Sequence, residues 1–146
     1  MPFRIRTALV FCLLLLTLAI TANAQTSGAA FTEYKGMKIG AAADAVRTKL
    51  GSPKDKSDSM DLYVFSDNES AQFYYDGTHV VNAIMITYTN DLKSAPAAKD
   101  VFGVDVAPNA DGMIFKMERY PKAGYWISYT RTSGSDAMVN IAIQKM

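Results

Sequence analysis

The spacing of hydrophobic and polar residues changes from a helical period to a period of two along the chain. Val46 and Leu50 lie one turn apart, which predicts a helix over residues 41–50. Gly51 and Pro53 supply the signals that end a helix. Runs rich in Val, Ile, Tyr and Phe then predict strands over residues 61–66, 70–76 and 80–89.

The second half of the chain has the same order of elements. A short helix is predicted over residues 97–102, and Gly103 ends it. Three further strands are predicted over residues 112–120, 123–131 and 137–145. The intervening residues 54–60 and 90–96 are assigned to loops.

These elements predict an α+β fold with two layers, in which short helices pack on an antiparallel sheet of six strands. The repeated order indicates two degenerate helix-plus-three-strand units, as pseudo-repeats over residues 36–90 and 95–146. Chance self-similarity of an α+β sequence is the alternative.

Alternation along the strands predicts which side chains face the core. The residues expected in the core are Leu62, Val64, Ile84, Ile86, Tyr88, Tyr125, Ile127, Tyr129, Val139, Ile141 and Ile143. The opposite face would then carry Tyr63, Phe65, Tyr74, Met85, Met117, Arg119 and Trp126. Aromatic, Met and Arg side chains are enriched at protein interfaces, so these seven residues form a candidate binding face. Two alternatives stay open: the aromatic residues are buried, or the register is off by one residue, which would exchange the faces.

Residues 1–24 have the pattern of a secretory signal peptide. Arg4 and Arg6 precede an apolar run over residues 8–20, and Ala22-Asn23-Ala24 offers small residues for cleavage before Gln25. The apolar run is shorter than the ~20 residues that span a bilayer, although an uncleaved N-terminal anchor is an alternative. Cleavage would leave 146 − 24 = 122 residues, a single domain over residues 25–146. We expect it in the periplasm or outside the cell, with no stable membrane anchor after cleavage.

Composition narrows the classes of function. Removing two arginines from a formal net charge of +1 leaves −1, so nothing indicates a nucleic-acid partner. Cys12 is the only cysteine and lies in the leader, which argues against thiol chemistry in the mature chain. His79 is the only histidine and lies beside the Asp76-Gly77 hairpin signal. We therefore predict no catalytic site, no metal site and no cofactor, and the tip Asp76, Gly77 and His79 is a second candidate contact.

One segment resembles a known envelope family. The pattern Gly36-Met37-x-x-Gly40-x-x-x-Asp44-x-Val46-x-x-x-Leu50-Gly51-x-Pro53 resembles the opening motif of the SmpA/OmlA (BamE-like) envelope domain, and the resemblance extends over residues 34–90. The doubled helix-and-sheet order is also similar to the tandem units of secreted β-lactamase-inhibitor proteins. Type members of the envelope family are anchored through an N-terminal lipidated cysteine, whereas Cys12 lies within the apolar run.

The resemblance implies a non-enzymatic binding module of the cell envelope or exterior. The expected function is therefore an exported module that binds a protein partner of unknown identity. Two alternatives are a structural envelope-maintenance subunit related to outer-membrane assembly, and a secreted enzyme inhibitor. If the protein is a secreted enzyme inhibitor, the hairpin tips, including residues 133–136, would be the parts that contact the enzyme.

Overall fold

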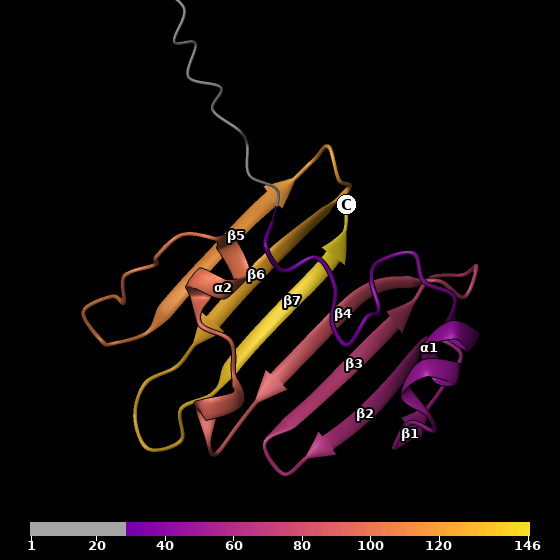
Figure 1. Ribbon diagram of the computed structural model, residues 1–146, viewed down its shortest axis with the longest axis horizontal. Helices are drawn as coiled ribbons and strands as arrows, with labels where there is room; N and C mark the ends of the chain where they lie inside the picture. The colour runs from indigo at the N-terminus through magenta and orange to yellow at the C-terminus, as the bar shows by residue number, and fades with distance from the viewer. Residues whose placement is uncertain (1–28) are drawn as a thin grey trace, which may run out of the picture.

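The computed structural model describes residues 29–146 and shows an α+β protein with an open, antiparallel sheet of seven strands and two short helices (Figure 1). The predicted signal peptide and its cleavage site lie outside the described residues. The strands are β1 Asp55–Lys56, β2 Met60–Ser66, β3 Glu69–Tyr75, β4 Val81–Tyr88, β5 Ile114–Tyr120, β6 Tyr125–Arg131 and β7 Val139–Lys145. The helices are α1 Ala43–Leu50 and α2 Ala98–Phe102, with a 3-10 turn, η1, at Leu92–Ser94.

The six predicted strands and both predicted helices are confirmed, each within two residues of its expected bounds. Strand β1 and the turn η1 were not predicted, and both lie in the segments assigned to loops. Strand β1 has only two residues, both exposed, so it has no hydrophobic alternation to detect. Backbone bonds hold it beside β2, from Lys54 N–H to Leu62 C=O (2.7 Å) and from Ser57 N–H to Met60 C=O (2.8 Å).

The strand order is β1-β2-β3-β4-β7-β6-β5. The first half of the chain contributes α1 and β1–β4, the second half contributes α2 and β5–β7, and the last strands of the two halves, β4 and β7, pair at the centre. Ile84 lies opposite Ile143 and Ile86 opposite Ile141, and all four side chains are fully buried.

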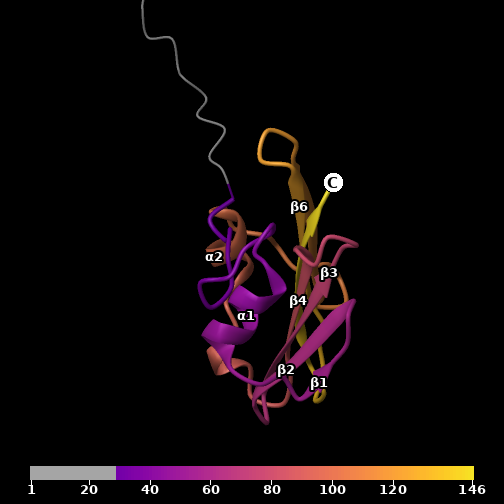
Figure 2. The same cartoon turned by 90° about the vertical axis from the view of Figure 1, so that its right-hand side faces the viewer.

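Both helices lie on the same side of the sheet (Figure 2). Helix α1 turns Ala43 and Val46 inward, with Asp44 in its first turn and Arg47 and Lys49 in its last, as the helix dipole favours. It ends at Gly51, whose φ of 83° and ψ of −159° are accessible only to glycine. Val46 of α1, Val101 of α2 and Phe73 of β3 are completely buried and belong to one hydrophobic core.

Side-chain alternation is confirmed on β4, β6 and β7. The expected core residues Ile84, Ile86, Tyr88, Ile127, Tyr129, Val139, Ile141 and Ile143 are buried, and Tyr125 packs half-buried against them. On β2 the expected register is wrong by one residue. Val64 is 53% exposed and Leu62 shares its face, whereas Asp61 and Tyr63 are buried.

Candidate functional site

Tyr63 and Phe65 belong to the core side of the sheet and are not part of a binding face. Their rings stack at a centroid distance of 5.9 Å, and Tyr63 packs edge-on against Phe73 at 5.7 Å. The Tyr34 ring covers Phe65 from the N-terminal segment at 5.9 Å. The Tyr63 hydroxyl donates to the carbonyl of Gly51 (3.2 Å) at the end of α1. These aromatic residues therefore join α1 and the N-terminal segment to the sheet.

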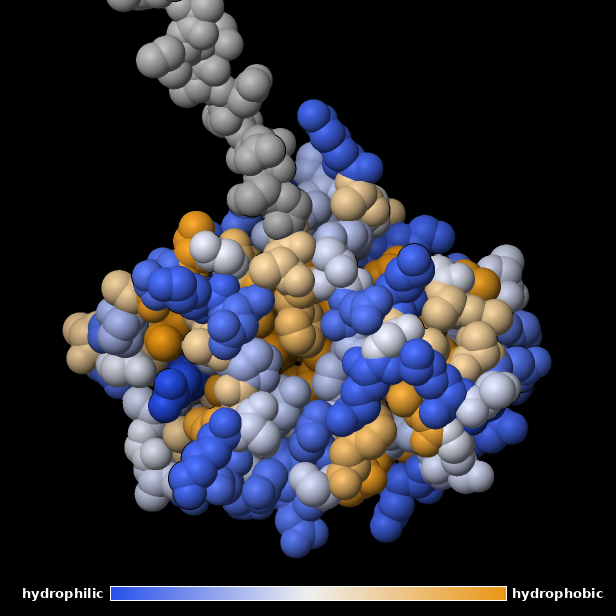
Figure 3. Space-filling view, viewed as in Figure 1, coloured by the Kyte–Doolittle hydropathy of each residue, from blue (hydrophilic) through white to orange (hydrophobic). Residues whose placement is uncertain are grey.

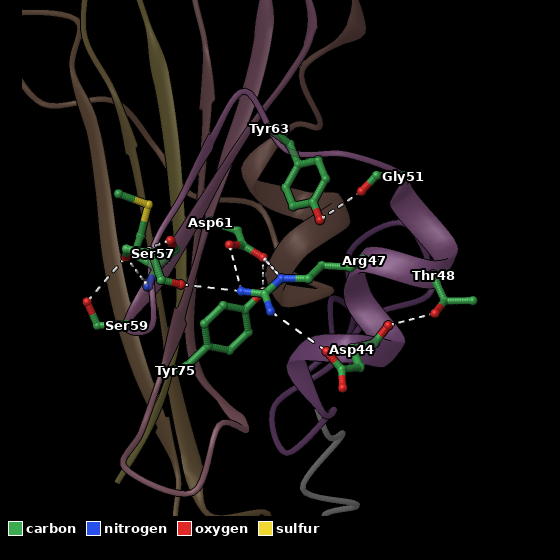
Figure 4. Close-up of polar contacts among 10 residues, drawn as sticks. Asp44, Arg47, Thr48, Gly51, Ser57, Ser59, Asp61, Tyr63 and Tyr75 are labelled. Carbon is green, nitrogen blue, oxygen red and sulfur yellow. Dashed lines mark hydrogen bonds and ion pairs between the residues drawn. The ribbon is translucent and has the colours of Figure 1, made fainter.

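A buried ion pair sets the register of β2. Asp61 is fully buried, and its two carboxylate oxygens accept from Arg47 Nε (2.8 Å) and Nη2 (3.0 Å), as Figure 4 shows. The Tyr75 hydroxyl donates to the same carboxylate (2.8 Å), and Arg47 Nη2 also donates to the carbonyl of Ser57 (3.3 Å). Since Asp61 points inward, Tyr63 and Phe65 must point inward too, because alternate residues of a strand share a face.

This network is structural in character. The hydrogen bonds and charge of Asp61 raise the pKa of Arg47, and burial followed by the bond to Asp61 raises the pKa of Tyr75. Both groups therefore stay protonated at neutral pH, and every polar group of the trio has a partner. The arrangement fixes α1 to β2 and β3, and the Asp61 carboxylate has no exposed surface that a substrate could contact.

The other side of the sheet carries no helix among residues 29–146, and we call it the open face (Figure 2). Three rows of side chains cross its six long strands. The first row is Met60, Tyr74, Ala83, Gln144, Trp126 and Arg119; the second is Leu62, Gln72, Met85, Ala142, Ser128 and Met117; the third is Val64, Ser70, Thr87, Asn140, Thr130 and Phe115. Five of the seven residues predicted for a binding face lie here, namely Tyr74, Met85, Met117, Arg119 and Trp126.

The open face exposes large apolar side chains. Met85 at its centre is 41% exposed, Met117 50%, Val64 53% and Phe115 65%. Val64 and Phe115 were not among the residues predicted for this face. Phe115 alternates with Met117 and was detectable from that spacing, whereas the register error on β2 assigned Val64 to the core.

The polar residues of the open face are almost all uncharged. Thr87 donates to the Asn140 side chain (2.9 Å), and Tyr74 donates to the Gln72 side chain (3.0 Å). Arg119 is the single charged residue in the three rows. Figure 3 shows the helix-bearing side for contrast: hydrophilic residues predominate there, and hydrophobic ones form small, separate patches.

The predicted hairpin tip lies between β3 and β4, away from the centre of the open face. Asp76 accepts through Oδ1 from the Thr78 N–H (2.9 Å) and hydroxyl (2.6 Å), and these bonds lower its pKa. The His79 carbonyl accepts from the Ala43 N–H (2.9 Å) at the start of α1, while its side chain is exposed. The turn is thus anchored to α1, and only Gly77, Thr78 and His79 are exposed at it.

A second acidic side chain, Glu69, fixes the N-terminal segment. It accepts from the Tyr34 hydroxyl (2.6 Å) and pairs with Lys35 Nζ (3.1 Å). Burial alone would raise the pKa of Glu69, but the bonds from Tyr34 and Lys35 outweigh burial and lower it. Among residues 29–146, no group of three or more His, Cys, Asp or Glu side chains is arranged to hold a metal ion.

Comparisons with protein-family models, curated proteins and solved structures found no significant match. No helix in the described part of the chain is long and apolar enough to span a membrane. The side chains of the open face are therefore the basis on which we take it as the candidate site.

Proposed function

We propose that this protein is an exported, non-enzymatic module that binds a protein partner in the cell envelope or outside the cell through the open face of its sheet. Export rests on the leader pattern of residues 1–24, and the non-enzymatic assignment rests on the residue chemistry described above. The binding role rests on one observation, the charge content of the open face.

Charged residues are scarce on the open face relative to an ordinary surface. A surface adapted only to water carries roughly 25–35% charged residues, or about five among eighteen positions. The three rows of six contain one, Arg119, and Asp55 of β1, which lies opposite Leu62, adds a second at the far edge. Depletion of charge together with enrichment of aromatic residues, Met and Arg is the composition of a protein interface. The exposed Met85 and the neighbouring uncharged hydrogen-bonding groups suit a partner surface that is also uncharged.

Two finer features of the fold belong to the same proposal. The helices and the sheet form two layers, and the two halves of the chain are degenerate repeats; their pairing through β4 and β7 supports this. The resemblance to the BamE-like envelope domain remains a proposal that rests on the motif of residues 36–53. Its glycines are consistent with a structural motif, since Gly36, Gly40 and Gly51 all have positive φ.

The secreted-inhibitor alternative depends on the hairpin tips. An inhibitor of that kind presents a loop to an enzyme, but the β3–β4 turn is tied to α1 through His79 and to β7 by Lys145 Nζ, 3.9 Å from Asp76 Oδ2. It exposes a small polar tip, whereas the open face exposes several large apolar side chains. The open face is therefore the better-supported contact.

A site-specific photocrosslinker tests the binding role. Placed at Met85, at the centre of the open face, it should capture a partner from envelope extracts; placed at Ala45, exposed on α1, it should not. Replacing both Tyr74 and Trp126 by Ala should abolish capture at Met85 and lower the melting temperature by only a few degrees, because both residues are half-buried on the open face. Equal capture from both positions, or none from either, would remove the support for the proposal.

A further inference from the structure

The two edges of the sheet differ sharply. One edge is closed by β1, a strand of two exposed charged residues, which leaves little backbone for another strand to pair with. The other edge is β5, seven residues long with no Pro, no Gly and no register shift against β6. Within residues 29–146, β5 pairs with β6 alone, so its outer side offers a template for a further strand.

The free peptide groups of β5 belong to Phe115, Met117 and Arg119. The Tyr120 carbonyl accepts from the N–H groups of Ala123 and Gly124 (2.9 Å each), so the peptide groups of Tyr120 face the β6 side. In an antiparallel strand the N–H and C=O of one residue point to the same side, and the side alternates from residue to residue. Residues at odd positions of β5 therefore direct their N–H and C=O outward.

The sequence of β5 is complementary to itself when reversed about Met117. A second β5 paired antiparallel on this centre places Met117 opposite Met117, Phe115 opposite Arg119, Lys116 opposite Glu118 and Ile114 opposite Tyr120. Arg over an aromatic ring, a Lys–Glu pair and two apolar pairs are all favourable cross-strand neighbours. Lys116 and Glu118 interact within one chain at 3.1 Å, and Lys116 also lies over the Phe102 ring at 5.1 Å, yet both side chains keep exposed surface, 29% and 42%, for contact with a second strand.

We propose that β5 pairs with β5 of a second copy of this chain, forming a two-fold dimer with one continuous sheet and its axis at Met117. On the open-face side, Met117 contacts Met117 of the second copy and Phe115 contacts its Arg119. On the helix side, Lys116 pairs with Glu118 of the second copy. The proposal goes beyond the binding role above, since the contact needs no other protein and runs along an edge of the sheet.

Charge reversals test the register. Purified protein expressed from its full sequence should sediment as a dimer that dissociates on dilution. Lys116→Glu or Glu118→Lys places like charges opposite each other twice per dimer. Each variant should therefore raise the dissociation constant of the dimer by about tenfold or more. Mixing the two single variants, or combining them in one chain, restores opposite charges and should restore the dimer. Lys99→Glu, which reverses an exposed lysine on α2, is the control and should leave association unchanged.

Crosslinking provides a second test that does not depend on the charge variants folding. Directly opposite residues of an antiparallel pair have Cα atoms about 5.5 Å apart, within the range that a disulfide bridges. Met117→Cys should therefore form a disulfide-linked dimer under mild oxidation, whereas Met85→Cys, similarly exposed but central, should not. A chain that stays monomeric at millimolar concentration, a dimer indifferent to the single reversals, or equal crosslinking at both positions would each overturn the proposal.

Discussion

Removing the guanidinium of Arg47 should be among the most destabilising single changes in this protein. Asp61 has no exposed surface, and Arg47 supplies both of its charge-assisted bonds from nitrogen. In the Arg47→Met variant the carboxylate keeps the Tyr75 hydroxyl as its only side-chain partner. Breaking a buried ion pair by deleting one partner costs about 3–5 kcal/mol. The Arg47 side chain is 23% exposed, so water can reach the vacated space, and we expect a loss near the lower limit.

A loss of about 3 kcal/mol is a large part of the 5–15 kcal/mol that stabilises a typical domain. It should lower the melting temperature by roughly 10 °C or more. Urea unfolding at pH 7, followed by circular dichroism, measures the free energy of unfolding directly.

Asp44→Asn is the matched control for this measurement. Asp44 contacts the same guanidinium at 3.7 Å, but its side chain is 97% exposed. Exposed pairs contribute little, so this variant should unfold close to the wild-type midpoint. The triple variant Arg47→Met/Asp61→Leu/Tyr75→Phe removes both charges and the hydroxyl that donates to Asp61, and it should regain most of the loss, because apolar groups replace buried ion pairs well. If Arg47→Met unfolds at the same urea concentration as Asp44→Asn, the buried pair does not stabilise the fold and the reasoning is wrong.

Two further predictions concern the loss of stability at acid pH through Glu69 and the cost of replacing Gly51. Since the folded state lowers the pKa of Glu69, its stabilising contribution is complete above the unfolded pKa of about 4.3 and disappears as pH falls through the folded value. Glu69→Gln should therefore be less stable than wild type at pH 7 and converge with it in urea titrations at strongly acid pH; a constant difference would contradict this. Gly51→Ala should cost about 1–3 kcal/mol in urea unfolding, because nothing crowds a Cβ there and the backbone conformation alone is unfavourable. Gly103→Ala, at a φ of 73° and ψ of 2°, should cost less, and equal losses would refute the conformational argument.

Periodicity and chain-breaking residues were sufficient to predict the helices and six strands. Strand β7 has β-branched residues at 139, 141 and 143 with Asn, Ala and Gln at 140, 142 and 144, and β4 has buried Ile84, Ile86 and Tyr88 in strict alternation, so their faces were predicted correctly. Strand β2 offers no such contrast, because Leu62, Tyr63, Val64 and Phe65 are apolar on both faces.

On β2 the choice of face therefore depends on Asp61, because a carboxylate that faced water would give the register that was predicted and is wrong. Its partner Arg47 lies on a helix fourteen residues earlier, a relation that strand alternation does not contain. The open face was correspondingly predicted well on β4, β5 and β6, and on β3 at Tyr74, and wrongly only on β2. A buried charge is costly without a partner, so the ion pair is the feature that had to be known before the face of β2 could be assigned.

The charged residues on the open face lie at its two edges, Asp55 on β1 and Arg119 on β5, and this separates the two proposed contacts. Arg119 is on β5, where a second copy would bring Phe115 opposite it, whereas the rows over β2, β3, β4, β7 and β6 have no charge at all. An arginine in the middle of an uncharged contact would have to lose its hydration. At β5, by contrast, Arg119 can stack on the Phe115 ring of a second copy while its guanidinium stays hydrated. The presence of Arg119 is therefore explained by the β5–β5 contact and not by the partner contact around Met85. Arg119→Ala should accordingly weaken self-association and leave photocapture at Met85 intact, and loss of capture with an unchanged dimer would reverse the assignment of the two surfaces.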